Sequence, residues 1–367
     1  MKFIDEYCNV ELSQRLVERI RHKSAREVRL MEFCGGHTHA ILRYGIRQLL
    51  PSTVEMLSGP GCPVCVTANA DLDKAIALSG LPGVILASFG DMLRIPGSYS
   101  SLQKAKAEGA DIRIVYSAMD ALRLARENPH RSIIFLGIGF EATAPTIAAS
   151  ILEAEGERID NYYVFSIHKL CPPVIRALLQ SGEVKLDGIV CPGHVSAIIG
   201  SQPYEFIAKE YGIACAVAGF EPLDILLSID MLLAQIESGK PEVEIAYRRG
   251  VRPEGNLRAQ EIMGQVFETC PATWRGIGEV PQSGLRLRQE YQRFDTEKAF
   301  YVDPGPPREA RGCLCGDILR GVKWPSDCRL FGQVCTPEHP VGPCMVSSEG
   351  SCAAYYQYQS HEAALSK

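Results

Sequence analysis

The stretch VRLMEFCGGHTHA, residues 28–40, decides how this chain folds. It reads as a short apolar strand that runs into cysteine and two glycines and then directly into a helix. The stretch VEMLSGPGCPVC, residues 54–65, repeats the pattern one strand later. Glycine lets the backbone turn sharply at such a point. Two consecutive strand-to-helix turns that both carry cysteine predict an α/β fold with reactive side chains at one edge of its sheet.

The alternation of strand and helix continues along the chain and predicts parallel sheets with right-handed crossovers. We predict two parallel-sheet α/β domains that face a cleft, at residues 25–125 and 126–240. A loop-rich, cysteine-rich domain follows at residues 241–367, to which residues 1–24 could also belong. The predicted strands are Val28–Phe33, Val54–Ser58, Val84–Ser88, Ile112–Tyr116, Ser132–Leu136, Tyr162–Ile167, Gly188–Cys191 and Ile213–Val217.

Polar and reactive residues follow nearly every one of these strands. Ligands bind at the carboxyl edge of an open parallel sheet. We therefore expect a functional cleft between the two α/β units. The segments that follow the strands are CGGHTH, GPGCPVC, FGD, YSAMD, GIGFEATAP, SIHK, CPGHVS and AGFEP.

Composition excludes several classes of function. The chain of 367 residues is 46% hydrophobic and 22% charged, which is an ordinary globular balance. Its net charge of -5 and the lack of a long basic run argue against nucleic acid and anionic membrane as partners. The N-terminal segment lacks the apolar core of a signal peptide, and no apolar run approaches the roughly 20 residues that span a bilayer. We expect a cytoplasmic protein, monomeric on its own, with reduced thiols.

Fourteen cysteines are unusual in such a protein, and the first clustered one is Cys34. It lies at the expected start of a helix, where the helix dipole lowers a thiol pKa and favours the thiolate that binds metal or attacks. His37 and His39 are two residues apart and diverge on a helix. One of them could face the cleft while the other packs or caps.

Cys62 and Cys65 form a C-P-V-C motif between glycine and proline residues. In a cytosolic α/β protein, such a pair indicates a redox-active dithiol or half of a metal site. The motif alone does not separate zinc, iron and disulfide exchange.

The tail from Cys313 to Cys352 carries six cysteines among prolines and glycines. The last four lack the tight C-x2-4-C spacing that structural zinc sites use. Four dispersed thiolates suit a cubane 4Fe–4S cluster better. Cys313 and Cys315 could be ligands instead of two of these, and a structural zinc site is an open alternative. The predicted cluster ligands are Cys328, Cys335, Cys344 and Cys352.

The segment GIGFEA, residues 137–142, matches the dinucleotide pattern G-x-G-x-x-A after a strand. That fingerprint also needs an acid at the end of the next strand, which ends in SIHK instead. A nicotinamide cofactor is therefore disfavoured. Glu141 and Asp91 are possible cleft acids, and His194 is the stronger histidine candidate because Gly193 beside it mirrors the Cys34 arrangement.

The segments CGGHTHA, GPGCPVC, GFEATAP, CPGHVS and AGFEP, together with the cysteine-rich tail, resemble the HypD family of nickel–iron hydrogenase maturation factors. The resemblance covers essentially the whole chain. The combination of motifs is highly specific, whereas each motif alone is not.

The resemblance implies a scaffold on which an iron centre with two cyanides and one carbon monoxide is built. It implies a small HypC-type chaperone and a HypE-type partner that carries cyanide as a thiocyanate. By motif, Cys34 resembles the iron-ligating cysteine, and Cys62 and Cys65 resemble a pair assigned to iron or to redox chemistry. The four tail cysteines named above resemble the ligands of a 4Fe–4S cluster.

These expectations combine into one hypothesis. Cys34 and a HypC cysteine hold the iron, while the cluster and the Cys62–Cys65 pair supply electrons for cyanide release. His37, His39 and His194 donate hydrogen bonds to cyanide or move protons. The alternatives are a cytosolic thiol–disulfide oxidoreductase that uses C-P-V-C, a nicotinamide-dependent enzyme and a structural zinc protein.

Overall fold

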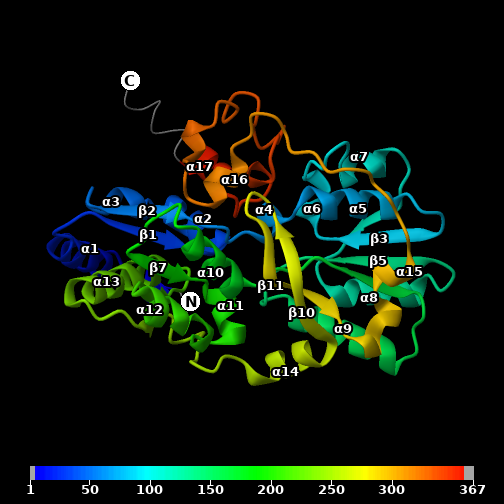
Figure 1. Cartoon of the computed structure of the whole chain (residues 1–367), viewed down its shortest axis with the longest axis horizontal. Helices are drawn as coiled ribbons and strands as arrows, with labels where there is room; N and C mark the ends of the chain where they lie inside the picture. The colour runs from blue at the N-terminus through cyan, green and yellow to red at the C-terminus, as the bar shows by residue number, and fades with distance from the viewer. Residues whose placement is uncertain (1–4, 359–367) are drawn as a thin grey trace.

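The computed structural model describes residues 5–358, and in them the predicted α/β class is confirmed. Two parallel sheets lie side by side, with helices packed around them (Figure 1). The strand orders are β2-β1-β7-β8-β9 and β4-β3-β5-β6. The first sheet contains β1 (Val28–Glu32), β2 (Val54–Ser58), β7 (Gly188–Cys191), β8 (Ala214–Val217) and β9 (Val243–Ile245), and the second contains β3 (Val84–Ser88), β4 (Ile112–Ile114), β5 (Ser132–Gly137) and β6 (Tyr162–Ser166).

The strands are divided between the sheets differently from the prediction. The ranges 25–125 and 126–240 do not separate the two sheets, because the chain leaves the first sheet after β2, builds the whole second sheet, and returns with β7. The strand β1 pairs in parallel with β7, so that Leu30 lies opposite Gly188. Buried parallel strands are apolar throughout. The sequence of one such strand therefore does not specify which other strand lies beside it.

Helices connect the strands of both sheets, and each helix buries an apolar face. In α13 this includes Leu226, Ile229 and Leu233. A helix of this kind gains most of its stability from tertiary packing rather than from intrinsic propensity. Up to β9 the helices are α1 (Val10–Lys23), α2 (Gly35–Arg43), α3 (Ile46–Leu49), α4 (Pro63–Val66), α5 (Asn69–Ser79), α6 (Gly90–Arg94), α7 (Leu102–Ala107), α8 (Ala118–Glu127), α9 (Ala144–Gly156), α10 (Cys171–Ser181), α11 (Gly193–Ile199), α12 (Glu205–Tyr211) and α13 (Pro222–Ser238), with 3-10 turns η1 (Asp5–Cys8) and η2 (Gln202–Tyr204).

The part after β9 includes the loop-rich, cysteine-containing C-terminal region that the sequence predicts, and it also contains elements that were not predicted. It contains an antiparallel hairpin of β10 and β11, in which Cys270 lies opposite Gly284. The exposed positions of β10 alternate with less exposed ones, as in a strand with one face toward the protein. The elements are α14 (Leu257–Val266), β10 (Phe267–Trp274), β11 (Gly278–Leu287), η3 (Gln289–Phe294), α15 (Thr296–Ala299), α16 (Cys315–Leu319), η4 (Pro325–Asp327), η5 (Pro343–Met345) and α17 (Ser351–Tyr358).

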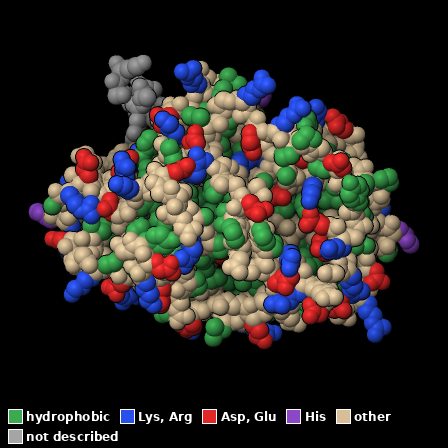
Figure 2. All heavy atoms as spheres, in the orientation of Figure 1, with side chains coloured by type: hydrophobic (Ala, Val, Ile, Leu, Met, Phe, Trp, Pro, Cys, Tyr) green, Lys and Arg blue, Asp and Glu red, His purple; other side chains and the backbone are tan. Residues whose placement is uncertain are grey.

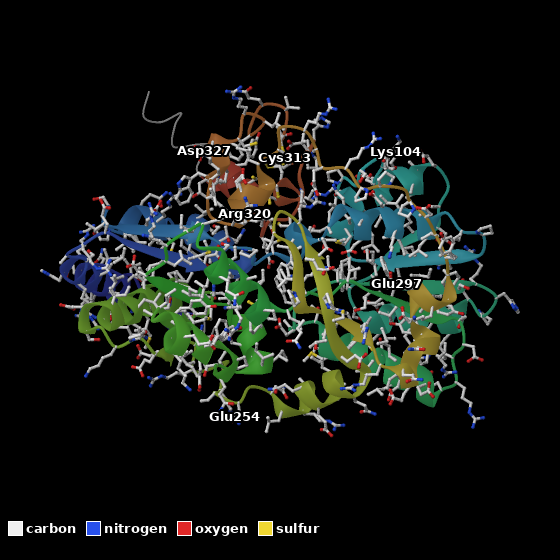
Figure 3. The ribbon with its side chains drawn as sticks, in the orientation of Figure 1. Lys104, Glu254, Glu297, Cys313, Arg320 and Asp327 are labelled. Atoms are coloured by element: carbon white, nitrogen blue, oxygen red, sulfur yellow. The ribbon has the colours of Figure 1, made fainter. Side chains whose placement is uncertain are left out.

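Residues 300–358, which we call the C-terminal region, run from α15 past α7, and the part with α16 and α17 lies above the gap between the two sheets (Figure 1). The tip of the β10–β11 hairpin reaches this region, since a Cβ on Gly276 would lie 2.2 Å from Cα of Gly316. Figure 3 shows Cys313 and Arg320 in the same place. The C-terminal region is therefore held by both α/β units and by the hairpin.

The surface shows no large patch of one charge on the face in Figure 2, where Lys and Arg side chains alternate with Asp and Glu. Among the described residues, no helix combines the length and apolarity needed to cross a bilayer.

Candidate functional site

The two cysteine motifs meet at the carboxyl edge of the first sheet. Because β1 and β2 are parallel neighbours, with Glu32 opposite Ser58, the loops after them leave the sheet at the same point. The N–H of Gly35 donates to the carbonyl of Gly61 at 2.9 Å. A Cβ on Gly61 would lie 2.2 Å from the backbone nitrogen of Cys34, so only glycine fits between the loops. The sequence order G-P-G-C thus places the C-P-V-C loop directly against Cys34.

Cys34 caps the N-terminus of α2 and is buried. Its N–H donates to Oε2 of Glu32 at 2.7 Å, and the hydroxyl of Thr38 donates to the other carboxylate oxygen of Glu32. Burial raises the pKa of the Cys34 thiol, and the charges of Glu349 and Glu32 add to the rise. Desolvation therefore outweighs the helix dipole, contrary to the sequence-based expectation of a lowered pKa. A bound cation would offset this cost.

Two acids accompany Cys34, the buried Glu32 and the half-buried Glu349. Burial raises the pKa of Glu32 to about 8, while that of Glu349 is raised to about 7 by burial and by the nearby charges of Cys65 and Asp91. Glu349 comes from the C-terminal region and packs on the CGGH loop, since a Cβ on Gly35 would lie 2.5 Å from its Cβ. No motif pointed to either acid, and the C-terminal region had to fold over the loop to bring Glu349 there.

Cys62 and Cys65 are both buried free thiols. Cys62 caps α4, and its Sγ accepts a hydrogen bond from the N–H of Cys65 at 3.2 Å. Burial raises the pKa of Cys62. Burial acts in the same direction on Cys65, but hydrogen bonds from Cys344 and Cys62 and the charge of Arg275 overcome it and lower its pKa. Cys65 is thus the thiol of the pair that ionises first.

Arg275 supplies the cation near this pair. It lies at the end of β10 and is buried, with its guanidinium bonded to the carbonyl of Thr67 at 2.9 Å, to Glu309 at 2.7 Å and to Asn69. The sequence analysis missed Arg275 because it lies about 210 residues from the C-P-V-C motif, in a hairpin that was expected to be loop.

All six tail cysteines line one cavity, which we call the six-cysteine pocket. It holds the four predicted cluster ligands and both alternatives. Cys344 also contacts three other thiols, those of Cys65, Cys315 and Cys352. It therefore joins the C-P-V-C pair to the pocket. The pocket cysteines are Cys313, Cys315, Cys328, Cys335, Cys344 and Cys352.

The donor set of this pocket consists of thiols, which are the ligands of both iron–sulfur clusters and structural zinc. Six thiols exceed the four that one zinc ion or one cubane takes. Across residues 5–358, no group of three or more His, Cys, Asp or Glu side chains is arranged to hold one metal ion.

The three candidate histidines have different surroundings. His37 is buried, its Nε2 bonds the carbonyl of Ala218 at 3.2 Å, and burial lowers its pKa to about 4. Neutral His37 thus has its one N–H engaged and none left to donate. His39 turns toward the C-terminal region, with Nδ1 at 3.3 Å from the carbonyl of Ser348 and Nε2 at 3.4 Å from Tyr358. His194 is largely exposed, and the partial burial of its ring lowers its pKa.

The remaining sequence candidates lie outside the thiol array. A Cβ on Gly139 would lie 1.8 Å from Oγ1 of Thr143, so tight packing explains this glycine of GIGFEA. Asp91 lines an open cavity of about 770 Å³ between α6 and the C-terminal region. Cys34 and the C-P-V-C thiols are not among the residues that line this cavity.

Glu141 gives a pH-dependent prediction. Its Oε1 accepts the N–H of Cys171 at 2.9 Å, its Oε2 has no partner, and burial raises its pKa to about 7. The folded state therefore holds this proton more tightly than the unfolded state, and the free energy of unfolding falls as pH rises from 4.5 through 7, by about 3 kcal/mol. Urea unfolding between pH 4.5 and 8 should show a loss that is smaller by this amount in Glu141→Gln than in the wild type, because the raised pKa values of Glu32 and Glu349 contribute the same loss to both proteins.

Glu108→Gln is the control for this measurement, because Glu108 is exposed at the end of α7. It should keep the wild-type pH dependence. Equal pH slopes for Glu141→Gln and the wild type would contradict the prediction.

Comparison with known proteins agrees with these motifs. Residues 11–359 match the HypD family, described as "Hydrogenase formation hypA family". A hydrogenase maturation factor HypD from Cupriavidus necator is 49% identical over 368 residues, covering 98% of this chain and 97% of that protein. The HypD of Escherichia coli K12 is 44% identical over 370 residues, covering 99% of each. The match spans nearly the whole length of both chains, and this chain belongs to the HypD family.

Proposed function

We propose that this protein is a maturation factor for nickel–iron hydrogenase. It acts as a redox-active scaffold that assembles the Fe(CN)2CO unit with a HypC-type small chaperone and a HypE-type cyanide donor. The observation that carries the proposal is that the cysteine-bearing segments contact one another in series. The Cys34 loop packs on the C-P-V-C loop through Gly61, and Cys65 contacts Cys344 of the six-cysteine pocket. The names of the relatives support the same role in hydrogenase maturation.

The iron unit is cargo in this proposal, and Cys34 is its ligand on this chain. Iron that carries cyanide and carbon monoxide is a soft centre that suits thiolate. Cys34 is buried as a neutral thiol. It loses its proton when the metal binds, because the metal compensates the negative charge of the thiolate. A cysteine of the HypC-type partner supplies a second thiolate, and His194 is the histidine of the three that has a donor free.

The electron balance of cyanide release indicates the role of the C-P-V-C pair. Release of cyanide from a thiocyanate, RSCN, breaks the S–C bond and takes two electrons. The dithiol Cys62–Cys65 supplies both on forming a disulfide, so that RSCN and two cysteine thiols give RSH, HCN and one disulfide. Cys65 ionises more readily than Cys62 and is the attacking thiol.

The six-cysteine pocket would hold the 4Fe–4S cluster. When bound, the cluster supplies electrons one at a time. The proposed ligands are Cys328, Cys335, Cys344 and Cys352, with Cys313 and Cys315 as the alternatives. The contacts of Cys344 with Cys65 and Cys315 give it a second possible role, as the thiol that passes reducing equivalents to the C-P-V-C pair.

The test is anaerobic purification followed by iron and sulfide analysis of the wild type and of six single Cys→Ser variants, one for each pocket cysteine. We expect four variants to lose the visible absorption of the cluster and two to keep it. Cys344→Ser decides the role of Cys344. If Cys344 is a cluster ligand, this variant loses the cluster, and if Cys344 only passes reducing equivalents, the variant keeps it. A colourless wild type with zinc or without metal would contradict the cluster proposal.

A thiol–disulfide oxidoreductase is the alternative function. Such an enzyme must present its attacking thiol to another protein. Here Cys62 and Cys65 are 3% and 0% exposed, which disfavours attack on an external protein disulfide. The burial instead suits a reaction that takes place inside the assembled complex.

A further inference from the structure

One aromatic ring, that of Phe220, joins the two glycine–histidine motifs. Phe220 follows β8, whereas the motifs CGGH and CPGH begin α2 and α11. A Cβ on Gly36 would lie 2.9 Å from Cε1 of Phe220, and a Cβ on Gly193 would lie 3.1 Å from its Cε2. The first separation is shorter than real Cβ contacts, and the second is tighter than most of them; at Gly193 the carbonyl of Ala218 lies closer still, at 2.4 Å. The two motif glycines therefore leave room for the same ring.

The ring also lies between the two histidines of these motifs. Its centroid is 4.0 Å from that of His194 in a stacked arrangement, with 24° between the planes, and 4.9 Å from that of His37. Tyr247 contacts it edge-on at 6.1 Å. His37 is fixed by its hydrogen bond to the carbonyl of Ala218. His194 is exposed and forms no hydrogen bond with any of the described residues. Stacking on Phe220 is thus the contact that orients His194.

Phe220 lies beside the Cys34 thiol as well. The Cβ position at Gly36 that is 2.9 Å from the ring is 3.6 Å from Sγ of Cys34. The ring and the thiol flank the same glycine, on the side of the site that also carries the exposed His194. An aromatic ring at this point excludes water from the thiol without offering it a hydrogen bond.

We propose that Phe220 is a positioning residue of the iron-binding site. Its ring closes the side of Cys34 next to Gly36 and sets the plane of the His194 imidazole. This inference rests on the proposed function for its iron chemistry, and on the metal-free geometry alone for its shielding of Cys34. Sequence analysis did not single out Phe220, because its phenyl ring has no group that reacts or binds metal.

The first test measures shielding in the metal-free protein. Iodoacetamide labelling under reducing conditions, followed at each cysteine by peptide mass spectrometry, should label Cys34 several-fold faster in Phe220→Leu than in the wild type. Phe220→Tyr keeps the ring and should restore slow labelling. Phe206→Leu is the matched control, because Phe206 is a half-buried ring of α12 that stacks under Arg176, at 4.1 Å, and should leave Cys34 unchanged.

Gly36→Ala tests the same contact from the other side. Alanine favours the helix but pushes the ring away, so Cys34 labelling should rise as in Phe220→Leu, with the folded fraction of the variant checked by thermal unfolding. Labelling at the wild-type rate in both variants would overturn the proposal.

The second test uses the complex with its HypC-type partner, loaded with iron. Phe220→Leu should retain the iron–cyanide infrared bands but shift and broaden them, because the surroundings of the ligands become wetter and less uniform. Unshifted, sharp bands would overturn the positioning role. Absence of these bands in the wild type would instead overturn the proposed function, and the labelling result would still decide whether Phe220 shields Cys34.

Discussion

Replacement of Cys34 by alanine is expected to abolish the iron–cyanide and iron–carbonyl infrared bands of the purified complex. The visible absorption of the six-cysteine pocket should remain. Cys34 is the thiol that stands alone at the N-terminus of α2, whereas the pocket thiols lie in the C-terminal region. Removing the proposed iron ligand therefore leaves the proposed cluster ligands intact. Loss of one thiolate from a site built on two protein ligands should cost most of the bound iron unit.

The control for this experiment is Cys270→Ala. Cys270 is a half-buried cysteine of β10 that no proposed site includes. It should keep both the infrared bands and the visible absorption. Infrared bands at full strength in Cys34→Ala would show that the iron is held by other residues.

Replacement of Cys62 by serine is expected to block cyanide transfer while the HypC-type partner still binds. Serine keeps the acceptor that caps α4 but cannot form the disulfide that supplies two electrons. Single-turnover transfer from a thiocyanate-loaded donor, followed by infrared spectroscopy, should show no transfer beyond the rate without this protein. Partner binding can be measured by gel filtration of the mixed proteins.

Cys215→Ala is the matched control for the Cys62 variant. Its thiol lies 3.2 Å from that of Cys191, so these two also form a close, buried pair, on the neighbouring strands β7 and β8. If proximity of two thiols were enough, this pair would serve as well. We expect transfer at the wild-type rate in Cys215→Ala. An unchanged rate in Cys62→Ser would end the proposal that C-P-V-C supplies the electrons.

The local parts of the site follow from the sequence. Strand, glycine turn and helix occur within about ten residues, so VRLMEFCGGHTHA alone places Cys34 at a strand end, and GPGCPVC alone places Cys62 at the start of a short helix. The parallel class of the sheets also follows, because strands that alternate with helices have few other ways to bury their apolar faces. These predictions depend on backbone geometry and periodicity, which short segments carry.

The tertiary structure decided what lies next to what. Strand β7 inserts beside β1 although about 160 residues separate them, so the sheets do not divide near residue 126. Arg275 reaches Cys65 from a hairpin, Glu349 reaches Cys34 from the C-terminal region, and Phe220 fits between two glycines. Burial then raised the pKa of Cys34, where the helix dipole alone predicted a fall. Contacts and desolvation depend on segments far apart in the chain, and no short stretch of sequence records them.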